Sequence, residues 1–387
     1  MFYPSEIFTF TLSAIYKLLT MPPNQGKIDA LGGNDHGFMN RHRKVSPDKR
    51  EVINEEDYNP PSKRRTYLLG RLNTVLNNRP VPASFWAALL LSDMEMLEKM
   101  VIGAEKSTFL LEFFIHGCMA LPLLWKQCRS EQRATTAQLP HPPADAEVHG
   151  TLREEQWHNH QTSERDRGKC VVRRVAPMQI VEIYPRSLSN PELSRQAKAY
   201  PPFWDMLKYF WTPKRIAEWR QQIFSDRRSP MQALDNLSNL MCLSADLKQM
   251  WALGIFALKP LAYSEDRTQL EVQFFWQPRP GHSINHHIPL LTRPSSSRDL
   301  PGLVEDDVVQ TGSAFLNVRS EWQKIMSGQR FTFTTPDPIK LPLPSKELLE
   351  MQWVLTRLVN LSGAGLLPDG HELDHYENDG THRFQLF

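Results

Sequence analysis

The chain has 387 residues, of which 41% are apolar and 10% aromatic, values typical of a globular protein that buries a core. Lysine and arginine number 45 against 43 acidic residues, so the formal charge of +2 excludes a polycation that coats nucleic acid indiscriminately. The four cysteines form no CxxC pair, which argues against a zinc ribbon or a disulfide framework, and we expect reduced thiols in an intracellular protein.

Residues 1–66 are predicted to form a disordered arm, part of which precedes the true start of the protein in one interpretation. The apolar run at residues 1–20 is interrupted by charges and too short to cross a bilayer, so we expect no membrane partner. Lys49–Arg50 and Lys63–Arg65 have the spacing of a two-part nuclear import signal, although basic clusters are common in disordered arms. A nuclear location is therefore one hypothesis.

Two apolar-rich helical patterns, at residues 84–103 and 107–128, follow within the region 67–130, and we expect them to pack on each other. Ser84 has the residue type of a helix N-cap. Residues 131–162 lose apolar periodicity and collect proline, histidine and charge. This composition predicts a flexible linker and a domain boundary.

After the linker, the β-prone runs 170–175 and 179–185 are predicted to pair as a hairpin. Residues 203–224 have the apolar spacing of two amphipathic helices with a break at Pro213, and their tryptophans are expected in the core. Ser244 is expected to cap a short helix that Gly254 ends ahead of a strand.

Residues 269–278 alternate apolar and polar side chains, which predicts a further strand, and Ser345 is expected to cap a late helix. The sequence therefore predicts an α+β protein. Its expected parts are an arm at 1–66, a helical region at 67–130, a linker at 131–162, a central domain at 163–277, an irregular or β extension at 278–344, a helix at 345–362 and a polar tail at 363–387.

The central domain, 163–277, resembles the HNH endonuclease domain found in many fungal proteins. The likeness lies in the runs CVVRRVAPMQIVEIYP and NLSNLMCLSADLKQMWALGIFALKP and in their order. It implies a ββα-metal core in which a histidine on a strand activates water, an asparagine braces a loop and a histidine on the helix holds a divalent metal. Asn239 matches the brace, whereas Glu182 and Lys248 stand where the two histidines would be.

These two replacements decide the expected chemistry. A protonated lysine has no lone pair for a metal, whereas a carboxylate can act as a base or bind Mg²⁺. We therefore expect a degenerate, non-catalytic nuclease core without a metal cofactor, in which the Lys248 ammonium takes the place of the metal and pairs with Glu182. Three alternatives stay open: two unrelated surface charges, a divergent endonuclease that uses Mg²⁺ or another divalent metal, and a structural interaction protein that relies on its N-terminal helices.

A basic cluster beside Cys170 is predicted to contact DNA phosphates by charge alone, with a solvated positive face as the alternative. The cluster consists of Arg165, Arg167, Lys169, Arg173 and Arg174. Two groups of histidines, at 282–287 and 371–382, lack a recognised ligand spacing, so no metal site is expected there.

Overall fold

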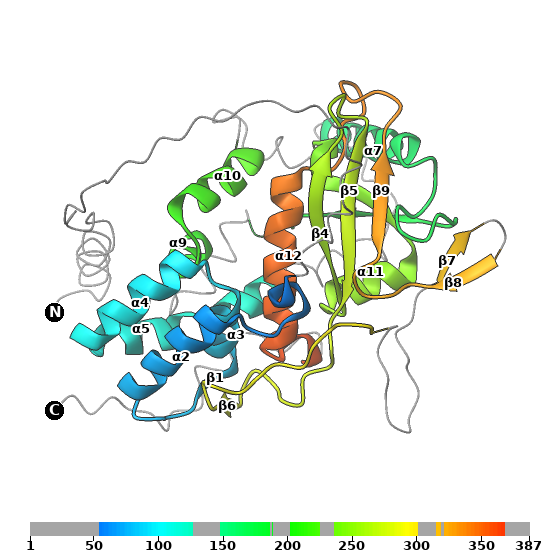
Figure 1. Ribbon diagram of the computed structural model, residues 1–387. Coiled ribbons are helices and arrows are strands. Elements are labelled where there is room, and N and C mark those ends of the chain that lie inside the picture. The colour runs from blue at the N-terminus through cyan, green and yellow to red at the C-terminus, as the bar shows by residue number, and fades with distance from the viewer. Residues whose placement is uncertain are drawn as a thin grey trace, which may run out of the picture. The chain divides into compact units, whose positions relative to one another are not determined.

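Helix α12 (Lys346–Leu361) lies between a β-sheet and a group of helices in the computed structural model, which describes residues 54–126, 148–185, 188, 202–224, 236–300, 315–318 and 321–367 (Figure 1). From Leu348 to Leu361 every residue except Glu350 is buried, because α12 is covered on all sides. The Ser345 Oγ accepts the N–H of Leu348 at 3.2 Å, which confirms the predicted cap. From Glu55 on, the chain groups into one compact unit.

The sheet that packs on α12 is antiparallel and has the strand order β4-β5-β9. Leu270, Val272 and Phe274 of the middle strand are fully buried and alternate with more exposed residues, which confirms the predicted strand. The three strands are β4 (Phe256–Tyr263), β5 (Gln269–Trp276) and β9 (Arg330–Thr334).

Three short antiparallel ladders complete the β structure of the described residues. They pair β1 (Val81–Pro82) with β6 (His287–Ile288), β2 (Gln179–Glu182) with β3 (Leu240–Leu243), and β7 (Phe315–Val318) with β8 (Glu321–Lys324). The first ladder joins residues more than 200 positions apart, so it ties the N-terminal helices to the segment between β5 and β9.

The N-terminal region is helical, but its boundaries differ from the prediction. It contains η1 (Glu55–Tyr58), α2 (Lys63–Val75), α3 (Ala83–Leu91), α4 (Met94–Lys106), α5 (Phe109–Gly117) and a further helical stretch at 120–126. Ser84 is no cap, since it lies fully buried inside α3. The single helix predicted over 84–103 is divided at Asp93, whose N–H donates to the Phe210 carbonyl at 2.8 Å and whose carboxylate accepts the Thr212 N–H. These tertiary bonds replace the bonds that would continue the helix.

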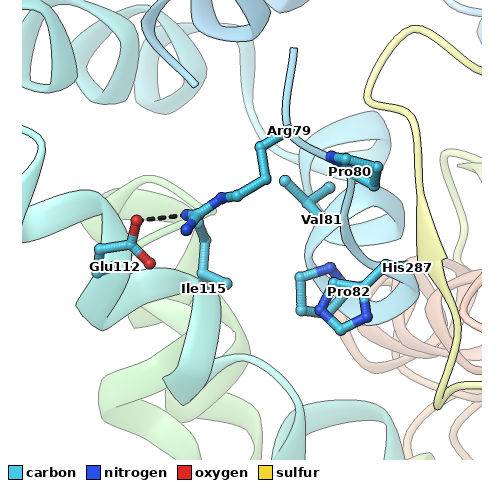
Figure 2. A pocket seen from close by; sticks show the side chains of 7 residues that line it. All are labelled: Arg79, Pro80, Val81, Pro82, Glu112, Ile115 and His287. Atoms are coloured by element: carbon cyan, nitrogen blue, oxygen red, sulfur yellow. Dashed lines mark hydrogen bonds and ion pairs between the residues drawn. The ribbon is translucent and has the colours of Figure 1, made fainter. Parts of the chain in front are cut away.

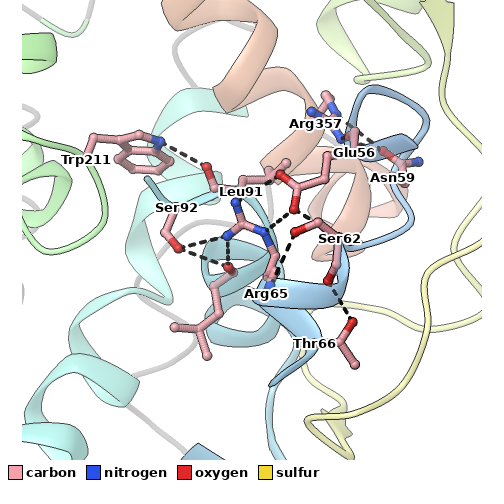
Figure 3. Close-up of polar contacts among 10 residues, drawn as sticks. Glu56, Asn59, Ser62, Arg65, Thr66, Leu91, Ser92, Trp211 and Arg357 are labelled. Carbon is pink, nitrogen blue, oxygen red and sulfur yellow. Dashed lines mark hydrogen bonds and ion pairs between the residues drawn. The ribbon is translucent and has the colours of Figure 1, made fainter. Parts of the chain in front are cut away.

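The arm predicted over 1–66 is ordered from Glu55 on, and its first 53 residues lie outside the described part of the chain. Glu56 receives two hydrogen bonds from Arg65, at 3.1 and 3.2 Å, and Arg65 also donates to the Leu89 carbonyl (Figure 3). Arg357 of α12 donates to the Glu56 carbonyl at 2.6 Å. Because Arg65 is only 5% exposed, the second half of the predicted import signal is not a freely accessible basic run.

The flexible linker predicted over 131–162 is wrong from residue 148, where helix α7 (Val148–Arg165) begins; residues 131–147 lie outside the described residues. The helix carries no continuous apolar stripe, and its Trp157 is 61% exposed. Its C-terminal end is instead held by the buried polar residues Thr162 and Arg165. The spacing of apolar residues in the sequence therefore does not predict this helix.

The hairpin predicted within 170–185 is also wrong. Residues 170–175 form a tight turn in which the Arg174 N–H donates to the Cys170 carbonyl at 2.8 Å, and β2 pairs with β3 instead. The remaining helices agree better with the sequence: α9 (Phe203–Leu207) and α10 (Pro213–Ile223) break before Pro213, and α11 (Ala245–Ala252) ends ahead of Gly254, which adopts φ +71°. The described residues also contain two single turns, η4 (Leu237–Asn239) and η5 (Ala364–Leu366).

Candidate functional site

The strands β2 and β3 and helix α11 form a strand-strand-helix unit. β2 and β3 run antiparallel, with Glu182 opposite Leu240 and Gln179 opposite Leu243. α11 begins directly after β3, with Ser244 in the predicted N-cap position, and packs against β2. The strand that carries Glu182 and the helix that carries Lys248 therefore belong to one small unit, and the predicted α+β class is confirmed.

Asn239 holds the chain where it leaves β2. Its side chain is buried, its Oδ1 accepts the N–H of Tyr184 at 2.8 Å, and its Nδ2 donates to the Tyr184 carbonyl at 3.1 Å. Its own carbonyl accepts the Ile183 N–H at 2.8 Å. One amide thus bonds both backbone groups of Tyr184, whereas its role as the brace of a nuclease-type core stays a prediction.

Glu182 and Lys248 are both half-buried. Lys248 lies in the first turn of α11, where its N–H donates to the Ser244 carbonyl at 2.8 Å. An ammonium at this position can donate hydrogen bonds and balance an anion, but it cannot coordinate a metal. The ion pair between Glu182 and Lys248 stays a prediction. Across the described ranges, no group of three or more His, Cys, Asp or Glu side chains is placed to hold a metal ion.

Arg165 is buried, so the phosphate contact predicted for it is wrong. The residue is 1% exposed, and its guanidinium donates to the carbonyls of Leu237, Pro342 and Leu240 at 2.9, 2.8 and 2.7 Å. It also forms two hydrogen bonds to Asp166, at 2.7 and 3.1 Å. Arg165 therefore fixes the end of α7 to η4 and to the segment before α12, and its charge does not reach solvent.

The other members of the basic cluster differ in their surroundings. Arg167 and Lys169 are exposed. Arg173 is half-buried and pairs with Asp246 of α11 at 2.5 Å. Arg174 is exposed at its surface but donates to a backbone carbonyl of β9. The cationic surface predicted here is therefore smaller than the sequence suggests. Among the described residues, only Arg167 and Lys169 of this cluster are exposed without an ion pair or hydrogen bond to another element.

Asp166 is a structural residue that the sequence analysis missed. Its side chain is 3% exposed, and besides binding Arg165 its Oδ2 accepts the N–H of Cys242 at 2.9 Å. Burial, with a smaller effect of the Asp166 charge, raises the pKa of the Cys242 thiol well above its ordinary value. In the sequence, the run ERDRGK resembles a solvated charged segment and gives no signal of a buried pair.

A surface hollow of about 290 Å³ lies beside the β1–β6 ladder, and no residue of the strand-strand-helix unit lines it (Figure 2). Two of its lining residues, Arg79 and Glu112, carry opposite charges and form an ion pair with each other. The hollow is lined by Arg79, Pro80, Val81, Pro82, Glu112, Ile115 and His287. Because Arg79 and Glu112 neutralise each other, the charges that line the hollow do not indicate which class of ligand it could bind.

The histidines at 282–287 have structural partners. The His282 ring binds the Leu361 carbonyl at 2.8 Å and meets Trp86 edge-on at 5.6 Å. His286 Nδ1 accepts the N–H of Ser283 at 3.1 Å. These contacts fix a turn against α3 and α12, and the histidines at 371–382 lie outside the described residues.

The tryptophans of the α9 to α11 region are mostly core residues, as predicted. Trp211, Trp219 and Trp251 are at most 2% exposed. Trp204 differs, since it is only half-buried. Cys118, Cys170 and Cys242 are free and buried, in agreement with the expectation of reduced thiols, and Cys128 lies outside the described residues.

In the part of the chain that the structure describes, none of the helices combines the length and the apolar character needed to cross a membrane. Comparison with protein-family models, with curated protein sequences and with solved structures gave no significant match to this chain.

Proposed function

We propose that this protein is a binding module built on a catalytically inactive ββα core of the HNH type, and that nucleic acid is the ligand class it binds. The observation that carries the proposal is the contact of Asn239 with both backbone groups of Tyr184, in a strand-strand-helix unit whose helix presents a lysine. The order of the elements and the position of the brace fit the resemblance, whereas the two reacting side chains do not.

Lys248 supports a binding role over hydrolysis. A phosphodiester cleaved by a ββα core needs a divalent metal on the scissile phosphate, and an ammonium in the place of the metal ligand repels such an ion. The lysine at this position therefore supports binding rather than metal-assisted cleavage.

The exposed cations Arg167 and Lys169 support nucleic acid as the ligand class, because they can contact phosphates without losing an internal partner. The competing function is a divergent endonuclease. Glu182 favours it, since a carboxylate can serve as a general base or as an oxygen ligand for Mg²⁺.

Plasmid cleavage separates the two functions. The wild-type protein is incubated with supercoiled plasmid and Mg²⁺, Mn²⁺ or Ni²⁺, beside Glu182→Gln and the double variant Glu182→His, Lys248→His, and Mn²⁺ binding is measured by calorimetry. We expect neither cleavage nor Mn²⁺ binding by the wild type, and Mn²⁺ binding by the double variant. Wild-type nicking that Glu182→Gln abolishes would overturn the proposal in favour of the endonuclease.

A further inference from the structure

Beside the strand-strand-helix unit, α9 and α10 carry a partly exposed aromatic surface. Trp204 of α9 and Phe224, the residue after α10, are half-buried and meet edge-on, with ring centroids 6.0 Å apart. The guanidinium of Arg220 lies over both rings, 5.6 Å from each centroid. We call these three residues the α9–α10 aromatic surface.

Arg220 is exposed, and no acidic side chain within the described residues forms an ion pair with it. Arg215, on the same helix, shows the contrast: its guanidinium also lies over a ring, that of Trp219 at 5.2 Å, but it is shared between Asp93 and Glu350 at 2.5 and 2.8 Å. Of these two arginines, only Arg220 keeps its donors available to an anion from solution.

Trp204 connects the aromatic surface to the end of β2 through the buried ring of Tyr184. The ring of Tyr184 lies nearly parallel to that of Trp204, with centroids 6.1 Å apart and an interplanar angle of 23°. Tyr184 is the residue whose backbone Asn239 holds, and it lies two positions after Glu182. The aromatic surface is thus attached to the braced corner of the strand-strand-helix unit.

We propose that the α9–α10 aromatic surface binds single-stranded nucleic acid, with a base stacked against one of its two rings, which stand edge-on to each other, and a phosphate paired with Arg220. The proposal rests on the proposed function, because it names the ligand and the contact surface of the same binding module. Aromatic faces and an available guanidinium are what single strands require, since any unpaired base offers a π-face and each nucleotide brings a charge.

The same features argue against the other ligands. The bases of a duplex are stacked on one another and cannot reach half-buried rings without being unstacked. An acidic peptide would use the charge of Arg220 but would gain little from the rings. The surface therefore discriminates between single and double strands, which the exposed cations Arg167 and Lys169 cannot do by charge alone.

Fluorescence anisotropy of the full chain tests this inference with a labelled oligothymidylate of about 12 nucleotides, the order of a single-strand site, and a duplex of the same length. The variant is Arg220→Gln, and the matched control is Lys214→Gln, which removes one exposed positive charge from the same helix. We expect Arg220→Gln to weaken oligothymidylate binding about tenfold and Lys214→Gln less than about twofold. Arg220→Lys, which keeps the charge without the planar group, should fall between them.

Circular dichroism and urea unfolding establish that the variants fold like the wild type. Equal losses for Arg220→Gln and Lys214→Gln would overturn the inference, because charge alone would explain the binding. Wild-type binding of the duplex without the oligothymidylate would overturn it too, while the proposed function would stand. Plasmid nicking by the wild type, in contrast, would overturn the proposed function and leave the single-strand contact intact.

Discussion

Replacement of Arg165 by alanine tests whether the cationic cluster contains a structural residue. The change removes the guanidinium donor from the carbonyls of Leu237, Leu240 and Pro342, of which that of Leu237 keeps the Leu240 N–H, and it leaves the carboxylate of Asp166 without its cation. A buried acceptor that loses its partner costs about 1 kcal/mol or more, and breaking a buried ion pair from one side costs about 3 to 5 kcal/mol. Because Asp166 keeps the N–H of Cys242, we expect a total loss of about 3 to 5 kcal/mol in the free energy of unfolding.

Urea unfolding followed by circular dichroism measures this loss, and Lys169→Ala is the matched control, since it removes a neighbouring exposed cation. The control should change stability by less than about 0.5 kcal/mol. If Arg165→Ala unfolds at the same urea concentration as Lys169→Ala, the reasoning from burial is refuted. Because a protein weakened by several kcal/mol can be partly unfolded, nucleic-acid binding should be tested with Lys169→Ala and Arg167→Ala alone.

Three further predictions follow from contacts in the fold. Asn239→Ala should lower the free energy of unfolding by about 1 to 3 kcal/mol in urea, because it removes the two buried hydrogen bonds of the amide to the Tyr184 backbone. Burial alone would raise the pKa of Glu56, but the hydrogen bond and charge of Arg65 lower it below the ordinary value. The free energy of unfolding should therefore fall as the pH drops through the acid range below 4.5. Glu56→Gln should flatten this pH dependence in unfolding curves measured at several pH values. Gly363→Ala should lower the melting temperature, because φ is +76° and the new Cβ would lie 2.4 Å from a backbone oxygen, whereas Gly281→Ala, where nothing lies within 4 Å, should leave it nearly unchanged.

The helices and strands whose positions are set by neighbouring residues could be predicted from the sequence. Ser345 begins α12, Gly254 follows α11, and the alternation in β5 appears in its burial, because caps, left-handed turns and period-two patterns act over a few residues. Asn239 was singled out only by the resemblance to the HNH domain, and its contact with Tyr184 lies beside the adjacent strand pair.

What the sequence could not give depends on distant partners. β2 pairs with a strand nearly 60 positions later, and no local feature distinguishes that partner from the nearby run at 170–175. Arg165 looks like a surface residue because its three carbonyl partners come from 237–240 and 342. Helix α7 is held by polar contacts of Arg165 to residues that are distant in the sequence. Because α7 has no apolar periodicity, the sequence pattern predicts a linker for the same residues.

The position of α12 between the sheet and the N-terminal helices bears on how the chain can fold during synthesis. Helix α12 contacts both α3, which is synthesised early, and β4, which is synthesised later. Its Arg357 binds Glu56, 301 positions earlier in the chain. Contacts of such long sequence separation close late and slowly. A nascent chain that has not yet released α12 from the ribosome therefore exposes the apolar faces of both halves, and a product truncated before residue 346 should be retained by chaperones or degraded rather than accumulate as a folded fragment.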